Sequence, residues 1–208
     1  DPSSRHVETL AAATVRFGLQ GRVTASHLTS MHSMDNAYAD KLISLIAEAG
    51  MGAVANPLIN ITLQGRYDTY PKRRGMTRLP ELLRAGVPVA LGHDCVMDPW
   101  YRLGSHDMLE VASMAVHVGQ MTDEQGLHDC FSGVTQTAAR ILNLPDYGLA
   151  PGNPANLVVL QARSAIDAIR LRPARLYVLR HGRILSRTEP RLSHLYLTEE
   201  KLFDLSDV

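Results

Sequence analysis

The stretch that indicates the fold is Val87-Pro88-Val89-Ala90-Leu91-Gly92-His93-Asp94, an apolar run that ends in two polar residues. Two earlier runs have the same form, Arg22–His27 and Gly52–Pro57, and the first of them ends in a histidine. Each run is followed by a helical pattern of apolar residues. Strands that are apolar throughout and alternate with amphipathic helices predict a parallel sheet covered by helices.

The expected helices follow from apolar spacing and from their end signals. One helix is expected to begin at Asp1-Pro2 and another at about Asp35. Three more are expected over Thr77–Ala85, Met108–Val118 and Val134–Leu142, and the residues Thr122 and Gln125 form a capping box. A long loop is expected between the strand at Gly52–Pro57 and the helix at Thr77–Ala85. The chain therefore reads as three β/α units followed by further helices.

Three β/α units cannot close a barrel, which takes eight units and roughly 250 residues. An open sheet of three parallel strands would also leave its edges unpaired. We therefore expect residues 1–148 to be the C-terminal part of a larger α/β structure. Residues 149–190 change to period-two strands at Ala155–Leu160 and Arg175–Arg180, the latter forming a hairpin with Arg183–Leu185, and residues 191–208 read as a surface tail with little pattern.

Composition excludes several classes of protein. The 208 residues carry 21 Lys and Arg against 21 Asp and Glu, so the broad positive field that non-specific nucleic-acid binding needs is missing. Cys95 and Cys130 form no disulfide framework, which favours a reducing compartment. No run approaches the ~18 apolar residues of a membrane span. We expect a cytoplasmic protein that binds neither nucleic acid nor membrane.

Asp94 and His27 are the leading candidates for chemistry. A carboxylate that ends a buried strand is costly unless it meets a cation, a metal or several donors, although Asp94 could also simply cap the following loop. The His27 ring could ligate a metal, hold a water or satisfy a backbone carbonyl. Because parallel strands end at one edge of a sheet, the two side chains are expected to converge there, as in hydrolytic metal sites.

Neighbouring residues carry weaker signals. By strand alternation His93 faces away from Asp94, so we expect it to pack between strand and helix, and His32 is expected to be a loop residue. Cys95 is a candidate to line the pocket, and Trp100 either packs or stacks on a flat ring. The basic run Pro71–Gly75 is a solvated loop, an inter-subunit ion-pair site or, less in keeping with the zero net charge, a phosphate site.

Three long motifs resemble the bacterial cytosine deaminases of the amidohydrolase superfamily. They are Gly21–Ser33, Ala55–Gly75 and Gly92–Tyr101, and Pro151–Leu157 resembles the superfamily's return from its barrel to a small β domain. The resemblance covers about residues 1–187, in order. It implies the C-terminal portion of a metal-dependent (β/α)8 TIM barrel, with strands six to eight, plus part of a small β-sandwich domain.

The resemblance also implies roles for individual residues. Asp94 would be a metal ligand and the proton acceptor, and His27 would be catalytic, holding the hydrolytic water beside the substrate. Trp100 would border the substrate pocket. The other ligands of the divalent metal, zinc or iron, belong to family motifs expected upstream of this chain, so the isolated fragment is expected to be inactive.

Cys95 departs from the family, which usually has a second aspartate at this position near the C5 edge of the substrate ring. A thiol in place of a carboxylate frees space and removes a charge. The resemblance thus predicts metal-dependent deamination of cytosine or a related aminopyrimidine, with release of ammonia, in an intact parent enzyme. Rival predictions are 5-methylcytosine or another ring as substrate, and a non-catalytic half-protein that binds a partner chain. Self-association into a homo-oligomer is also expected.

Overall fold

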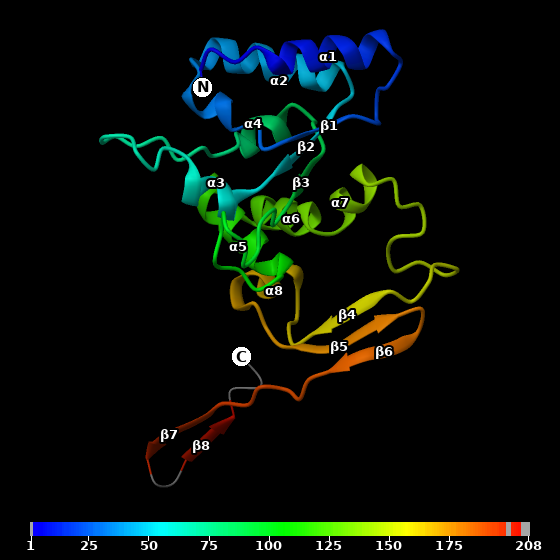
Figure 1. The fold of residues 1–208 in the computed structure, drawn as a ribbon. Helices are drawn as coiled ribbons and strands as arrows, with labels where there is room; N and C mark the ends of the chain where they lie inside the picture. Colours follow the sequence, from blue (N-terminus) through cyan, green and yellow to red (C-terminus); the bar gives the residue numbers. More distant parts are fainter. Residues whose placement is uncertain (1, 199–200, 205–208) are drawn as a thin grey trace. The chain divides into compact units, whose positions relative to one another are not determined.

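The computed structural model describes residues 2–198 and 201–204, and it divides into two compact units, Asp1–Gly148 and Leu149–Val208. The first unit contains a parallel sheet and most of the helices, and the second contains antiparallel strands and one helix (Figure 1). Each unit is described by itself. Within the described residues, no helix is both long and apolar enough to cross a membrane.

The first unit is built on three parallel strands in the order β1-β2-β3. Its elements are α1 (His6–Arg16), β1 (Thr24–Ser26), η1 (Thr29–Ser33), α2 (Asn36–Glu48), β2 (Gly52–Ala55), α3 (Pro57–Leu63), α4 (Leu79–Arg84), β3 (Val89–Leu91), α5 (Met108–Gly119), α6 (Glu124–Gly133) and α7 (Gln136–Ile141). The register pairs Thr24 with Gly52 and Ala53 with Val89. All three strands therefore point the same way and end at one edge.

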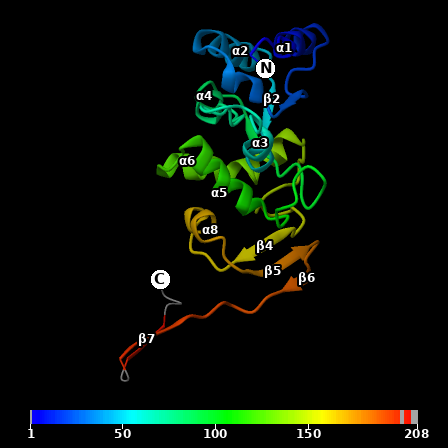
Figure 2. The ribbon, with the colours of Figure 1, turned by 60° about the vertical axis from the view of Figure 1, so that its left-hand side comes forward.

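The three strand-and-helix units are those that the apolar pattern predicts. Strand β3 is buried along its length and β2 almost so, because helices cover both strands. Figures 1 and 2 show α1 and α2 packed side by side. Leu42 and Ile46 of α2 are fully buried, as expected for the apolar stripe of a helix that faces a core.

Helix starts differ from the sequence prediction in three places. Helix α1 begins at His6 instead of Pro2, because the Arg5 guanidinium donates to the carbonyls of Pro2 and Ser4 and holds a turn there. Helix α6 is capped by Asp123, whose carboxylate accepts from the Gly126 amide at 2.9 Å, so the capping box at Thr122 was wrong. Helix α3 occupies part of the stretch that was expected to be loop, with Pro57 in its first turn.

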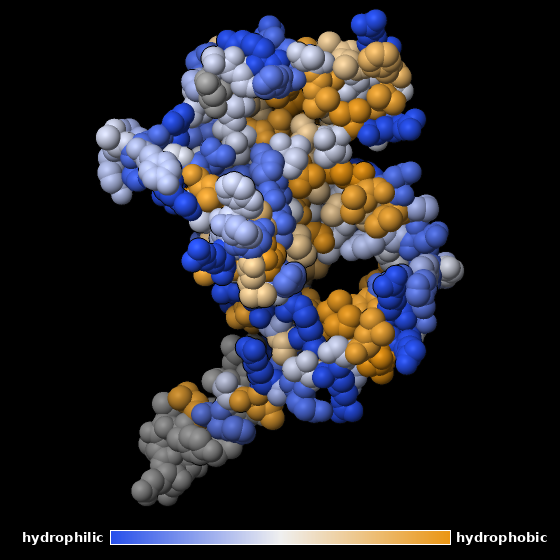
Figure 3. Space-filling model, in the orientation of Figure 1, coloured by the Kyte–Doolittle hydropathy of each residue, from blue (hydrophilic) through white to orange (hydrophobic). Residues whose placement is uncertain are grey.

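The loop between α3 and α4, residues 64–78, projects from the first unit (Figure 1). Its base is closed at Gly65, where a Cβ atom would collide with the carbonyl of Arg73. The Arg73 guanidinium makes two hydrogen bonds to the Asp68 carboxylate, of 2.6 and 2.7 Å. This bidentate pair braces a loop that is otherwise hydrophilic and open to solvent (Figure 3).

The second unit pairs its strands in the order β4-β5-β6, all antiparallel, as the period-two pattern predicts. Its elements are β4 (Leu157–Leu160), α8 (Ala165–Leu171), β5 (Arg175–Arg180), β6 (Arg183–Arg187), β7 (His194–Thr198) and β8 (Lys201–Asp204). Strands β7 and β8 form a hairpin inside the stretch 191–208 that the sequence marked as a tail; residues 199–200 and 205–208 of that stretch lie outside the described residues. Helix α8 was not predicted.

Candidate active site

The structure brings His27 and Asp94 together at the carboxyl edge of the parallel sheet. His27 directly follows β1, and its amide donates to the carbonyl of Val54 in β2 at 2.8 Å. Asp94 follows β3, and its Oδ2 lies 3.1 Å from the Nε2 of His27. The two side chains thus meet across the end of the central strand.

Both residues leave the sheet through a left-handed backbone conformation, with φ of 68° at His27 and 65° at Asp94. This conformation is uncommon outside glycine and occurs often at functional sites. It turns each side chain out of its strand direction while keeping it partly accessible, with 41% and 30% of the His27 and Asp94 side chains exposed. The pair is therefore open to a ligand on one side.

Two buried asparagines contact the other side of the imidazole. Asn60 Oδ1 lies 2.9 Å from His27 Nδ1, and Asn56 Nδ2 lies 3.3 Å from the same atom. Asn56 directly follows β2, and α3 starts at the next residue, so Asn60 comes one helical turn later on the same face. The sequence analysis missed Asn60. The signal that could have found it is a second asparagine four residues after the one that ends the strand.

The backbone of His27 is also held in place. Its carbonyl accepts a 2.6 Å hydrogen bond from the Thr77 hydroxyl, which lies just before α4. Next to it, the Arg78 guanidinium donates to the carbonyls of Met31 and Met34 and to the side chain of Asn36. The turn that follows β1 is therefore tied to the segment that leads into α4.

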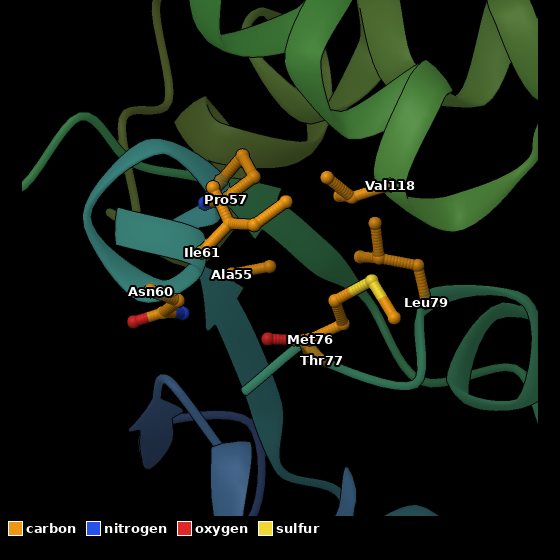
Figure 4. Close-up of a pocket in the computed structure, with 8 residues that line it drawn as sticks. All are labelled: Ala55, Pro57, Asn60, Ile61, Met76, Thr77, Leu79 and Val118. Atoms are coloured by element: carbon orange, nitrogen blue, oxygen red, sulfur yellow. The ribbon is translucent and has the colours of Figure 1, made fainter. Parts of the chain in front are cut away.

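Two residues that bond to His27, Asn60 and Thr77, also line a small pocket (Figure 4). These two residues line its polar side. The remaining lining residues are apolar: Ala55, Pro57, Ile61, Met76, Leu79 and Val118. The interior is no larger than about one water molecule, so the pocket belongs to the support of His27 and is too small for a substrate.

The loop after β3 places Cys95 against the carboxylate of Asp94, with the thiol donating to Asp94 Oδ1 at 3.4 Å. Hydrogen bonding to Asp98, burial and the charge of Asp94 raise the pKa of the Cys95 thiol to about 12. A nucleophilic cysteine needs a lowered pKa. Cys95 is thus a neutral thiol at pH 7, and it contributes a small side chain and a weak hydrogen bond to this loop.

Asp98 organises the rest of this loop. Its Oδ1 accepts hydrogen bonds from the amides of Trp100 and Tyr101, at 2.9 and 2.8 Å. These bonds, with that from Tyr101 the strongest contributor, lower the pKa of the Asp98 carboxyl. The turn leaves the Trp100 side chain 71% exposed. Trp100 therefore stands on the surface of the first unit, available to stack on a flat group.

His93 and His32 lie outside the pair formed by His27 and Asp94. His93 is buried, its Nδ1 is 2.9 Å from the carbonyl of Cys95, and its Nε2 is 4.0 Å from Glu110 of α5, so it sits between strand and helix as predicted. His32 lies in η1 and accepts a 3.4 Å hydrogen bond from the amide of Arg74. Burial, with the charge of Arg78, lowers the pKa of the His32 ring.

These features define a class of protein: an α/β structure whose parallel strands end in an imidazole and a carboxylate that face each other, supported by buried amides. The chain belongs to the amidohydrolase family, whose model matches residues 1–186. This membership confirms the superfamily resemblance at the level of the family.

Two curated relatives and one solved structure illustrate the similarity. The chain is 38% identical over 186 residues to a pterin deaminase of Rhizobium rhizogenes (strain K84 / ATCC BAA-868), and 28% identical over 184 residues to an N-isopropylammelide isopropyl amidohydrolase of Pseudomonas sp. (strain ADP). Each match covers 88% of this chain and 42% of the relative.

The solved structure is a 5-methylcytosine deaminase from Klebsiella pneumoniae liganded with 5-fluorocytosine, 42% identical with a TM-score of 0.88. That match covers 92% of this chain and 46% of the other. The chain therefore spans less than half the length of the relatives that it matches.

Proposed function

We propose that this chain supplies part of the active site of a hydrolytic deaminase that replaces a ring amino group with oxygen and releases ammonia. The observation that carries the proposal is the 3.1 Å approach of His27 Nε2 and Asp94 Oδ2 at the carboxyl edge of parallel strands. The names of the pterin and 5-methylcytosine deaminases that the chain resembles point to the same reaction. On this proposal β1, β2 and β3 are strands six to eight of a (β/α)8 barrel, and residues 149–190 belong to a β-sandwich.

The described residues could supply only some of the ligands of a divalent metal ion. No group of three His, Cys, Asp or Glu side chains that could hold a metal ion occurs in the described part of the chain. The Asp94 carboxylate beside an imidazole is nevertheless a donor set that suits zinc or iron. Asp94 would hold the metal together with ligands from further polypeptide, and the metal would supply Lewis acidity that lowers the pKa of a water molecule towards neutrality.

The chain's own residues then have separate tasks. His27 Nε2 orients the attacking water by hydrogen bonding, and the Asp94 carboxylate accepts a proton from it. The water oxygen forms a bond to the ring carbon, Asp94 passes the proton that it has accepted to the amino group, and the bond from the ring carbon to that nitrogen breaks, so that ammonia leaves. The left-handed turns at both residues hold the two side chains in place for this transfer.

The substrate that we propose is cytosine or a related aminopyrimidine, with 5-methylcytosine and pterin-like rings as the rivals. The Cys95 side chain contacts Asp94, is small and carries no charge, so it leaves space for a substrate ring beside Asp94. Trp100 offers an exposed aromatic face on the same loop. A ring with a substituent at its C5 edge is compatible with both features.

The test measures ammonia release by the complete enzyme from cytosine, 5-methylcytosine and pterin, for the unsubstituted protein and for Cys95→Asp. A carboxylate at position 95 adds charge and bulk, so we expect kcat/KM for the 5-substituted ring to fall about 10-fold or more relative to cytosine. Unchanged ratios would remove Cys95 from substrate selection. Absence of ammonia from every ring would contradict the proposed reaction.

A further inference from the structure

The segment that leaves β1, residues 27–36, begins with two consecutive residues in the left-handed backbone conformation, and we call it the exit segment. The φ angle is 68° at His27 and 54° at Leu28. For residues other than glycine this conformation is unfavourable, and it persists only where surrounding contacts hold it. The exit segment therefore depends on contacts that keep both residues in place.

The carbonyl of His27 is held by Thr77. Two other hydrogen bonds fix only the amide groups at the start of the exit segment. The His27 amide donates to the carbonyl of Val54 at 2.8 Å, and the next amide, that of Leu28, donates to the carbonyl of Ser26 at 2.9 Å. The buried Thr77 hydroxyl donates to the His27 carbonyl at 2.6 Å. This hydrogen bond fixes the direction of the peptide group that follows His27.

Arg78 holds the rest of the exit segment. Its Nε donates to the carbonyl of Met31 at 2.9 Å, and one terminal nitrogen donates to the carbonyl of Met34 at 3.2 Å. The other terminal nitrogen donates to Asn36 Oδ1 at 3.0 Å. The Arg78 side chain is only 15% exposed. Because the guanidinium group is planar and rigid, it fixes these three acceptors relative to one another.

We infer that Thr77 and Arg78 are positioning residues, which hold the exit segment and so fix where the imidazole of His27 meets Asp94. The catalytic meaning of this inference rests on the proposed function. Without the two hydrogen-bond donors, the left-handed residues would relax towards more favourable backbone conformations, and the imidazole would move with the backbone. A displacement of about 1 Å is enough to slow a reaction that depends on orientation.

The rival explanation is that apolar packing alone holds the exit segment. Its side chains at Leu28, Met31 and Met34 are all buried. Burial of apolar side chains is favourable but does not depend on direction, whereas a hydrogen bond fixes the direction of a carbonyl group. Variants that keep the size of a side chain and remove its hydrogen-bond donor therefore separate the two explanations.

The first test is amide hydrogen exchange of the full chain, followed by mass spectrometry in the exit segment, with α5 as the internal reference. Thr77→Val keeps the shape of the side chain and loses the donor, whereas Thr77→Ser keeps the donor. We expect exchange in the exit segment to be about 10-fold faster in Thr77→Val and close to normal in Thr77→Ser. Equal exchange in the two variants overturns the inference.

The same measurement on Arg78→Lys tests the guanidinium group. Lysine keeps the positive charge near Glu81 but has one nitrogen for three acceptors, so the exit segment should again exchange faster. Arg84→Lys is the matched control, because Arg84 is exposed and its Nε bonds to the carbonyl of Pro80 within α4. This control should leave the exit segment unchanged. Unchanged exchange in Arg78→Lys removes Arg78 from the inference.

In the complete enzyme the two residues should affect turnover more than substrate binding. We expect Thr77→Val to lower kcat by about 10²-fold with little change in KM, and Thr77→Ser to keep most of the activity. Faster exchange in the exit segment with undiminished kcat overturns the catalytic part of the inference. The expected exchange pattern in an enzyme that, even unsubstituted, releases no ammonia from any ring contradicts the proposed function alone.

Discussion

The two units of the chain differ in which side chains they bury. In the first unit, strands β2 and β3 are buried and polar side chains are taken into the interior; in the second, every residue of β6 is exposed. The buried polar residues among the described part of the chain all lie within residues 1–148: Thr14, Asn56, Asn60, Thr77, His93 and Ser113.

The first unit buries polar side chains at positions where burial lowers the stability of the fold. Burying a polar group is unfavourable unless it is hydrogen-bonded. Asn56, Asn60 and Thr77 bond to His27 or to its neighbour Ser26, and His93 bonds to the loop that carries Asp94. Four of these six buried polar residues thus bond to His27, to its neighbour Ser26 or to the loop that carries Asp94, which is the pattern expected where geometry is maintained for chemistry.

The largest expected effect is loss of activity on substitution of Asp94. On the proposed mechanism, Asp94→Asn in the complete enzyme keeps the size of the side chain but would remove the proton acceptor and weaken metal binding, so ammonia release should fall by about 10³-fold or more. Asp167→Asn, in α8 of the second unit, removes a half-buried carboxylate that pairs with Arg170 and should leave turnover unchanged. Near-normal turnover by Asp94→Asn would remove this residue from the mechanism.

The next largest effect concerns stability and tests the contrast between the units directly. Leu42 of α2 is fully buried, and Leu42→Ala should reduce the free energy of unfolding by about 2–5 kcal/mol. Ile184 of β6 is 55% exposed, and Ile184→Ala should cost about 0.5 kcal/mol. Urea unfolding of the full chain measures both. Equal losses would mean that the second unit carries a core as closely packed as the first.

The sequence predicts the meeting of His27 and Asp94 because the argument needs only strand direction: the carboxyl ends of parallel strands share an edge. It misses α3 because seven residues are too few for a helical period to stand out, and because Asn-Pro reads as the end of a strand. It misplaces the cap of α6 because Thr122 and Asp123 are both good caps, and only the backbone path decides between them.

The role of Asn60 lies beyond local patterns for a different reason. Asn60 and His27 are 33 residues apart, and their contact depends on β1 and β2 being in register while α3 starts directly after β2. Neither condition can be deduced from the residues around Asn60. The approach of His27 and Asp94 could therefore be predicted from the sequence, whereas the residues that support it required the tertiary structure.

A smaller effect is expected from Gly92→Ala, which tests the packing behind the pair. The new Cβ would collide with Asn56 Oδ1, and Asn56 cannot move without disturbing its bond to Ser26. We expect a loss of about 1–3 kcal/mol in unfolding free energy. Gly52→Ala is the comparison, because its Cβ would meet Thr24 Oγ1 at 3.2 Å, which calls for a smaller shift. Equal losses for the two variants would mean that the Asn56 carboxamide is not held as tightly as its contacts indicate.

The smallest effect concerns the exposed loop of the first unit, where an ion pair is made at the surface. Arg73, chiefly through hydrogen bonding, lowers the pKa of the Asp68 carboxyl from 3.8 to about 2. The unfolded chain therefore binds more protons than the folded one between these values, and the stabilisation present above pH 3.8 is lost as the pH falls through about 2.

Asp68→Asn and Arg73→Gln each remove this pair, so both should flatten the acid limb of the stability curve by the same small amount, and the double variant should add nothing further. Thermal unfolding of the full chain between pH 2 and pH 5 measures this change in the acid limb. Acid limbs that match the unsubstituted chain would show that the loop is braced by its backbone at Gly65 alone. In that case the Asp68–Arg73 ion pair would contribute nothing to the stability of the first unit in acid, and the contrast between the two units would rest on what they bury.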